Sequence, residues 1–99
     1  MAAYLVALVD VSDPERFAAY QALARPVVER WGGRFLASSQ APRTLEGDLR
    51  PQRVVLVGFD TLERCRAFYA SPEYQAAIGA RAGAARLQIV AAEGVEAPR

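Results

Sequence analysis

Hydrophobic residues in this chain gather in four short runs, and the segments after the first and third runs have helical spacing. The first run is short, contains β-branched residues and ends at the turn-forming residues Ser12, Asp13 and Pro14, which favours a strand over a helix. The four runs cover residues 4–11, 34–38, 53–59 and 87–92. The first and third runs are apolar on both alternating faces, so each of these strands must be covered on both sides.

The segment between the first two runs predicts a helix from Pro14 to Trp31. Asp13 is the expected N-cap, and Pro14 occupies the first helical position, where its missing N–H is tolerated. Apolar positions recur with a period near 3.6 residues and form a core-facing stripe. They are Phe17, Tyr20, Ala24, Val27, Val28 and Trp31. Pro26 falls inside this segment and is expected to bend or break the helix.

A second helical segment follows the third run. Asp60 is its expected N-cap, with Glu63 three residues later in the pattern of a capping box. Cys65 lies on the apolar stripe of this segment, where a free cysteine behaves as a small buried side chain. Ser71 and Pro72 then restart the helix in the same cap-and-proline pattern.

Two segments lie outside these elements. In the long connection between the second and third strands, we expect residues 44–46 to form a small extra strand or extended arm. Residues 96–99 are expected to be a frayed tail. No linker divides the remainder, so residues 1–95 are predicted to form one domain.

The order of elements predicts a ferredoxin-like α+β sandwich, βαββαβ, with an antiparallel sheet and the helices on one face. The other face would then expose apolar side chains of the first and third strands. Depending on register, the expected set is Leu5, Ala7 and Val9, or Val55, Val57 and Phe59. Because such a patch requires cover, we expect a homodimer packed sheet to sheet with two-fold symmetry.

The composition excludes several familiar kinds of chemistry. The 99 residues include no His, no Lys and a single Cys, so Cys–His pairs, Schiff bases and Cys/His zinc sites cannot be built. Twelve Arg and eleven acidic residues are interspersed and give a net charge of +1, unlike a nucleic-acid-binding protein. We expect no cofactor, no metal, no membrane span and, without a signal pattern or disulfide, a cytoplasmic location.

A set of motifs spread over residues 4–95 resembles a known family. The most specific is Tyr69-Ala70-Ser71-Pro72-Glu73-Tyr74-Gln75 with Arg81 downstream. The others are Asp13-Pro14, Tyr20 with Pro26, Gly32-Gly33-Arg34-Phe35, Glu46-Gly47, Arg53-Val54-Val55, and Phe59 with Phe68. Together they resemble the small bacterial family called domain of unknown function 1330, within the dimeric α+β barrel superfamily. The resemblance implies a ferredoxin-like fold and barrel-forming dimers, but no established reaction. Relatives in the superfamily include cofactor-free monooxygenases, isomerases and dehydratases, several of which rely on His.

Five residues are candidates for a site in the cleft between helices and sheet: Glu46, Arg53, Tyr69, Tyr74 and Arg81. Burial would raise the pKa of Glu46 toward the range of a general acid or base. Arg81, and more weakly Arg53, can hold an anion through a planar guanidinium group. The two tyrosine hydroxyls can donate hydrogen bonds from an apolar wall. Each residue also has a purely structural interpretation, as a solvated or ion-paired charge or as core packing.

Three functions therefore remain open at this point. The first is a small homodimer whose cleft binds a small anionic organic ligand. The second is a cofactor-independent enzyme of oxygenase, isomerase or dehydratase type, in which Glu46 moves a proton and Arg81 holds a developing anion. The third is a structural or interaction module without a ligand. A pocket that brings Glu46 and Arg81 within reach of each other would favour the first two, and a filled core would favour the third.

Overall fold

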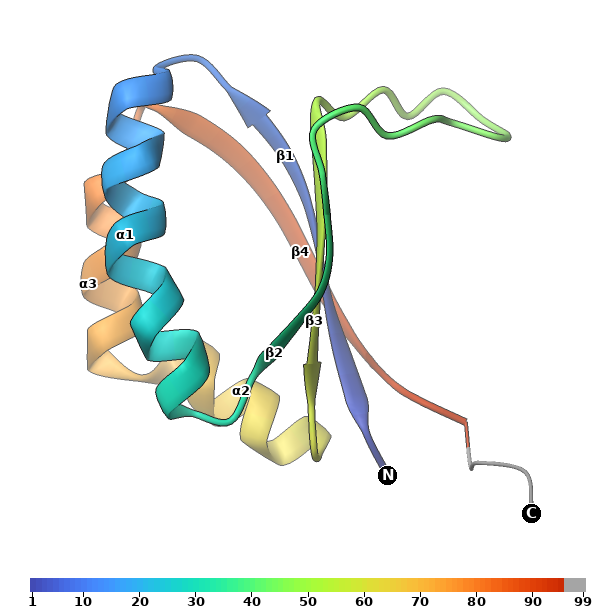
Figure 1. Ribbon diagram of the computed structural model, residues 1–99, viewed down its shortest axis with the longest axis vertical. Coiled ribbons are helices and arrows are strands. Elements are labelled where there is room, and N and C mark those ends of the chain that lie inside the picture. The colour runs from blue at the N-terminus through green and yellow to red at the C-terminus, as the bar shows by residue number, and fades with distance from the viewer. Residues whose placement is uncertain (96–99) are drawn as a thin grey trace.

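The computed structural model contains one antiparallel sheet with the strand order β2-β3-β1-β4, and its helices lie on one side of that sheet (Figure 1). Along the chain the elements are β1 (Ala3–Val11), α1 (Pro14–Arg30), β2 (Arg34–Ser39), β3 (Arg53–Phe59), α2 (Leu62–Ala70), α3 (Pro72–Ala80) and β4 (Ala85–Glu93). This is the expected ferredoxin-like α+β order, with the second crossover divided into α2 and α3. The structure describes residues 1–95, so the expected frayed tail at 96–99 lies outside the described residues.

The register of β1 decides which residues face the helices. Leu5 lies opposite Val57 in β3, and successive side chains alternate between the two faces. Facing the helices are the six side chains expected on the uncovered face: Leu5, Ala7, Val9, Val55, Val57 and Phe59. The expectation that these residues lie on the uncovered face is therefore wrong. Side chains along a strand alternate with a period of two, so once pairing between β1 and β3 fixes the register, all six lie on the same side of the sheet.

The uncovered side of the sheet, here called the open face, carries the alternate residues and is still apolar. Its apolar side chains are Tyr4, Val6, Leu8, Leu36, Val54, Leu56 and Val90. Leu36 covers Gly58, since a Cβ atom at Gly58 would lie 3.0 Å from the Leu36 Cδ1 atom. Asp10, Arg86 and Gln88 form a polar end of the same face. The open face therefore still needs to be covered, although its residues are not the ones expected from the sequence.

Helix α1 buries the stripe that its sequence predicts, with Phe17, Tyr20, Ala24, Val27 and Val28 in the core. The helix runs through Pro26 without a break and ends at Arg30, with Trp31 as its C-cap. Both Pro26 and Ala22, whose carbonyl loses its usual hydrogen bond, are exposed, so water can satisfy that carbonyl. The expected break is therefore absent. Within residues 1–95, no helix is long and apolar enough to cross a membrane.

The N-cap of α2 differs from the sequence prediction, and the N-cap of α3 agrees with it. Thr61, not Asp60, caps α2: its hydroxyl accepts a hydrogen bond from the Arg64 amide at 3.0 Å. Asp60 instead pairs with Arg34 at 3.3 Å, so the expected capping box is wrong by one residue. Ser71 caps α3 as expected, accepting a hydrogen bond from the amide of Tyr74 at 3.2 Å.

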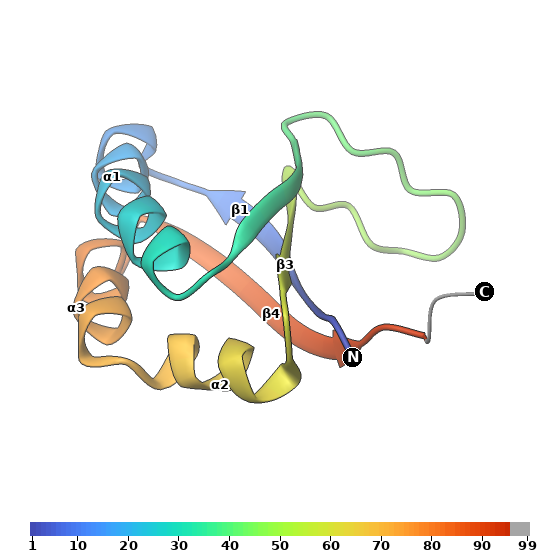
Figure 2. The same ribbon diagram turned by 60° about the horizontal axis from the view of Figure 1, so that its bottom comes forward.

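Residues 40–52, here called the arm, leave the sheet on the side opposite the helices (Figures 1 and 2). The extra strand expected at residues 44–46 is absent from this segment, because no other strand lies alongside to pair with it. The base of the arm is fixed to the sheet by Gln52. The backbone N–H of Gln52 donates a hydrogen bond to the Asp10 carboxylate at 3.0 Å, and its side-chain oxygen accepts one from the backbone N–H of Val11 at 3.0 Å.

The close approach at Gly33 gives a test of core packing. A Cβ atom there would lie 2.6 Å from the Val28 Cγ1 atom and 3.0 Å from the Phe59 ring. We expect Gly33→Ala to lower the free energy of unfolding by about 1–3 kcal/mol in urea denaturation. The matched control, Gly79→Ala near the end of α3, meets nothing within 4 Å and should raise it by up to about 1 kcal/mol. Changes of the same sign in both variants would contradict this account of the packing.

Candidate ligand-binding cleft

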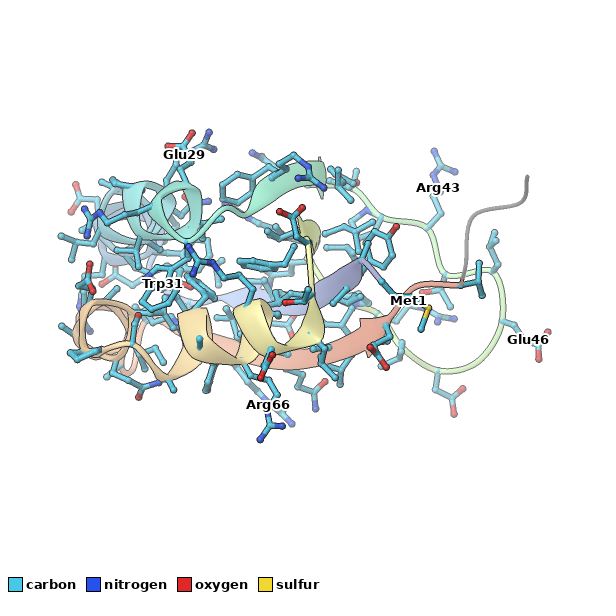
Figure 3. All side chains as sticks on the ribbon, turned by 90° about the horizontal axis from the view of Figure 1, so that it is seen from below. Met1, Glu29, Trp31, Arg43, Glu46 and Arg66 are labelled. Atoms are coloured by element: carbon cyan, nitrogen blue, oxygen red, sulfur yellow. The ribbon has the colours of Figure 1, made fainter. Side chains whose placement is uncertain are left out.

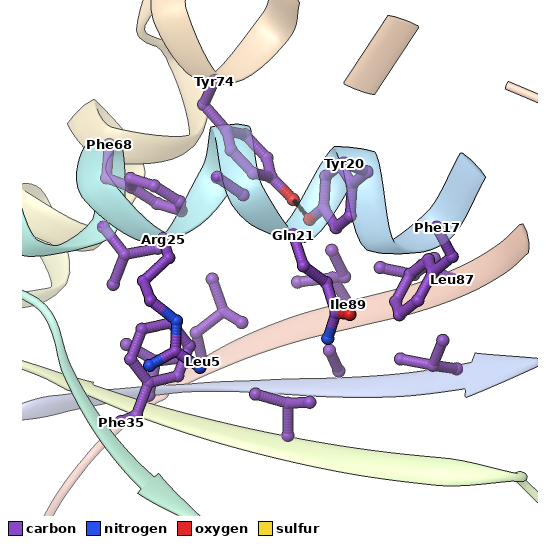
Figure 4. A pocket seen from close by; sticks show the side chains of 16 residues that line it. Leu5, Phe17, Tyr20, Gln21, Arg25, Phe35, Phe68, Tyr74, Leu87 and Ile89 are labelled. Atoms are coloured by element: carbon purple, nitrogen blue, oxygen red, sulfur yellow. Dashed lines mark hydrogen bonds between the residues drawn. The ribbon is translucent and has the colours of Figure 1, made fainter. Parts of the chain in front are cut away.

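A cavity of about 80 Å³ lies between α1 and the helix-facing side of the sheet (Figure 4). Its walls are mostly aliphatic and aromatic side chains from β1, β3, β4 and α1. The polar side chains in the lining are Tyr20, Gln21, Arg25 and Tyr74. Gln21, Arg25 and Phe35 are exposed to solvent, so they mark the mouth of this cleft. The space suits a few heavy atoms, since a water molecule in the liquid occupies about 30 Å³.

Two buried tyrosines supply the polar spot inside the cleft. Tyr20 from α1 and Tyr74 from α3 are 7% and 3% exposed, and their hydroxyl oxygens lie 2.7 Å apart (Figure 4). One hydroxyl donates to the other, so the pair keeps one hydroxyl proton for a further acceptor. Burial raises the pKa of Tyr20 above its ordinary value, and the neighbouring Tyr74 adds to the rise. At neutral pH the Tyr20 phenol is therefore a hydrogen-bond donor rather than a base.

Arg81 lies next to this tyrosine pair. Its guanidinium carbon lies 5.0 Å from the centre of the Tyr20 ring, and the residue caps the C-terminus of α3. The Nε atom of Arg81 is buried and has no hydrogen-bond partner among residues 1–95. A buried donor of this kind usually finds a ligand or an ordered water molecule as its acceptor.

Two further arginines stack on aromatic residues of the cleft lining. Arg25 lies 4.9 Å from the ring centre of Phe35, and Arg53 lies 5.3 Å from that of Phe17. Within the described part of the chain, neither of these arginines nor Arg81 has a carboxylate within 4.0 Å. The lining contains no acidic residue. Three arginines therefore lie on rings of the cleft lining, and none of them is paired with a carboxylate among residues 1–95.

The five sequence candidates fall in different places. Tyr74 and Arg81 meet at the tyrosine pair, and Arg53 lies at the Phe17 end of the same cleft. Tyr69 lies with its ring centre 5.5 Å from that of Tyr74, but it is 43% exposed and lines a separate groove between α2 and β4. Glu46 lies on the exposed arm, on the other side of the sheet from the helices (Figure 3). The structure therefore does not bring Glu46 to Arg81.

Two residues of the cleft were not among the sequence candidates. Tyr20 was assigned only to the core stripe, and its pairing with Tyr74 depends on how α1 and α3 pack. Arg25 follows Gln21 by four residues, which puts both on one flank of the helix beside the stripe. That spacing was a usable signal for the mouth of the cleft. The expectation for Cys65 is confirmed, since the thiol is buried and burial raises its pKa.

Comparison with known families and structures gives one family match. The model of the family described as Domain of unknown function (DUF1330) matches residues 2–95. No match was found among curated proteins.

Several solved structures share the fold. A protein of unknown function from Rhodopseudomonas palustris is 21% identical, with a TM-score of 0.77 over 97% of this chain and 84% of that one. A dimeric ferredoxin-like protein of unknown function from Jannaschia is 15% identical, with a TM-score of 0.70 over 95% and 100%. SnoaB, a cofactor-independent oxygenase from Streptomyces nogalater, is 15% identical, with a TM-score of 0.69 over 97% and 95%.

The burial of Tyr20 predicts a loss of stability at alkaline pH. Below pH ~10 both the folded and the unfolded chain keep this phenolic proton, whereas above it only the unfolded chain releases it. The free energy of unfolding should therefore fall above pH ~10, with a contribution from Tyr20 of up to about 1.4 kcal/mol per pH unit. In urea denaturation between pH 9 and 11, Tyr20→Phe should flatten this dependence. The control is Tyr69→Phe on α2, whose side chain is 43% exposed; an equal flattening there would contradict the assignment to Tyr20.

Proposed function

The chain belongs to the family of the domain of unknown function DUF1330, and we propose that it acts as a homodimer whose cleft binds a small organic anion with an apolar body. The observation that carries the proposal is the set of three arginines around the cleft. Each stacks on an aromatic side chain of the lining, and none has a carboxylate partner within residues 1–95. An anion entering the cleft would supply the missing negative charge.

The chemistry of the walls narrows the ligand further. The interior is apolar except for the tyrosine pair, so the body of the ligand should be a short aliphatic group or a small ring. Its charged oxygen would accept a hydrogen bond from the free hydroxyl of Tyr20 or Tyr74, and the Arg81 guanidinium group lies over the Tyr20 ring. A larger ring would require the stacked pair of Arg25 and Phe35 to move, because these residues border the mouth.

Binding is favoured over catalysis by what the lining lacks. Among the described residues that line the cleft there is no carboxylate, imidazole or thiol, and the pKa of Tyr20 is raised rather than lowered. A general base needs a pKa near the working pH and must reach the substrate. Glu46, the base of the enzymatic hypothesis, lies on the arm instead. The cavity itself argues against a module whose core is completely filled.

The homodimer is supported by the open face. Seven apolar side chains on the uncovered side of the sheet form a patch of the kind that marks an interface between proteins. The similar ferredoxin-like protein from Jannaschia is dimeric. A second copy packed sheet to sheet would cover the patch by the same residues from both sides, as two-fold symmetry requires.

Ligand charge can be tested with paired probes of equal shape. We expect isobutyrate to bind about tenfold more tightly than isobutyramide in calorimetric titrations at low salt, because only the carboxylate compensates the arginines. Arg81→Gln should reduce this preference to about twofold. Arg43→Gln removes the same charge from the arm and should preserve it. Equal binding of the acid and the amide by the parent protein, or no binding of either, would refute an anion site.

The sheet-to-sheet dimer can be tested by adding charge to the open face. Val6→Glu places a carboxylate at the centre of the patch, where the partner would leave it without water. We expect a folded monomer by light scattering at concentrations where the parent is a dimer, with circular dichroism confirming the fold. Ala22→Glu adds the same charge to the exposed side of α1 and should remain dimeric. A Val6→Glu variant that dimerises like the parent would exclude this interface.

A further inference from the structure

The mouth of the cleft carries a second set of polar groups, separate from the tyrosine pair. Gln21 and Arg25 lie one helical turn apart on α1, and both side chains run from the helix toward the sheet (Figure 4). Neither makes a hydrogen bond to another side chain of the lining. Arg25 also has no carboxylate within 4.0 Å among residues 1–95. The mouth therefore presents an amide and a guanidinium group whose N–H donors are available to a ligand.

A contact with an aromatic ring holds the Arg25 guanidinium group at the mouth. Its carbon lies 4.9 Å from the ring centre of Phe35, which belongs to β2 on the opposite side of the opening. A guanidinium group that contacts a ring still has N–H donors in its own plane, and these match the two oxygens of a carboxylate. Because the ring already positions this charge, a ligand that binds to it has little further ordering to cause.

The inner polar group lies at a different level along α1. Tyr20 and Arg25 are five residues apart, so their positions differ by about 7.5 Å along the helix axis. The strands contribute apolar side chains alone to the lining, among them Leu5, Val57 and Ile89. The cleft thus has hydrogen-bond donors near a positive charge at two separate levels of α1, and an apolar wall of strands faces both.

A ligand with one acidic group would satisfy only one of these levels. If its carboxylate binds at the tyrosine pair, the charge of Arg25 at the mouth stays uncompensated. Two carboxylates joined by three methylene groups, as in glutarate, lie about 5 Å apart, and a hydrogen bond of about 2.8 Å at each end extends this span. The second carboxylate would remain at the exposed mouth, where it keeps part of its water and is inexpensive to bind.

We propose that the ligand of this cleft is a short dicarboxylate with an acidic group at each end of an apolar chain. One carboxylate accepts a hydrogen bond from the tyrosine pair beside Arg81, and the other binds Arg25 and Gln21 at the mouth. This inference rests on the anion-binding function proposed above and adds a second acidic group to its ligand. Arg25 and Gln21 therefore select a diacid over a monoacid, although the inner carboxylate binds without them.

Glutarate and glutaramate provide the test, because they have the same length and shape and differ in one terminal group, a carboxylate or an amide. We expect the parent protein to bind glutarate about tenfold more tightly in calorimetric titrations at low salt. Arg25→Gln should reduce this preference to about twofold, and Gln21→Met should reduce it to about threefold. Neither change should alter the preference for isobutyrate over isobutyramide.

Two control variants separate a contact at the mouth from a general effect of charge. Arg66→Gln removes one positive charge from the exposed side of α2 and should keep the tenfold preference for glutarate. Arg53→Gln does so at the Phe17 end of the cleft and should also keep it. If either control lost the preference as fully as Arg25→Gln does, the assignment to the mouth would be overturned. Circular dichroism checks that each variant is folded.

The two pairs of probes also distinguish failure of the diacid from failure of the anion site. A parent protein that prefers isobutyrate over isobutyramide, but binds glutarate and glutaramate equally, would overturn the dicarboxylate and leave the anion site standing. Equal binding within both pairs would overturn both proposals.

Discussion

The structure depends on β1 being apolar on both of its faces. As the central strand, paired with β3 on one side and β4 on the other, it cannot turn either face toward water at low cost. Leu5, Ala7 and Val9 lie under the helices, and Tyr4, Val6 and Leu8 lie on the opposite side. The chain has helices for one side only. A single copy therefore leaves the second apolar face of the sheet uncovered, which supports the proposed homodimer.

The same helix layer also determines the cleft, through the kind of basic residue that the chain uses. All its basic side chains are arginine, whose planar and weakly hydrated guanidinium group stacks on aromatic rings more readily than a lysine ammonium group does. Arg25, Arg53 and Arg81 each lie on a ring of the cleft lining. These contacts hold positive charge next to an apolar interior. Among residues 1–95, none of the three arginines forms a salt bridge, and this favours a ligand with a negative charge of its own.

Local rules predicted most of the elements, and tertiary contacts decided the rest. Strand bounds differ from prediction by no more than two residues, because apolar runs ended by turn residues are local signals. The faces of β1 were assigned wrongly, since both are apolar and only pairing with β3 and packing under α1 distinguish them. Thr61 is the N-cap of α2, although Asp60 is at least as good a capping residue. The Asp60 carboxylate pairs with Arg34 instead. Within the site, the motif around Tyr74 and Arg81 predicts two of the residues, whereas the pairing of Tyr20 with Tyr74 depends on the packing of α1 on α3.

The two acidic residues of the arm lie away from the arginines of the cleft. Within residues 1–95, Arg25, Arg53 and Arg81 stack on rings of the cleft lining without a carboxylate partner, whereas Glu46 and Asp48 lie on the arm together with Arg43 and Arg50. A carboxylate placed near the cleft would neutralise the arginines and weaken any anion site. Because these acids lie on the arm, they leave the charge of the cleft arginines uncompensated. The sheet thus separates the acidic residues of the arm from the arginines that carry the proposed anion site.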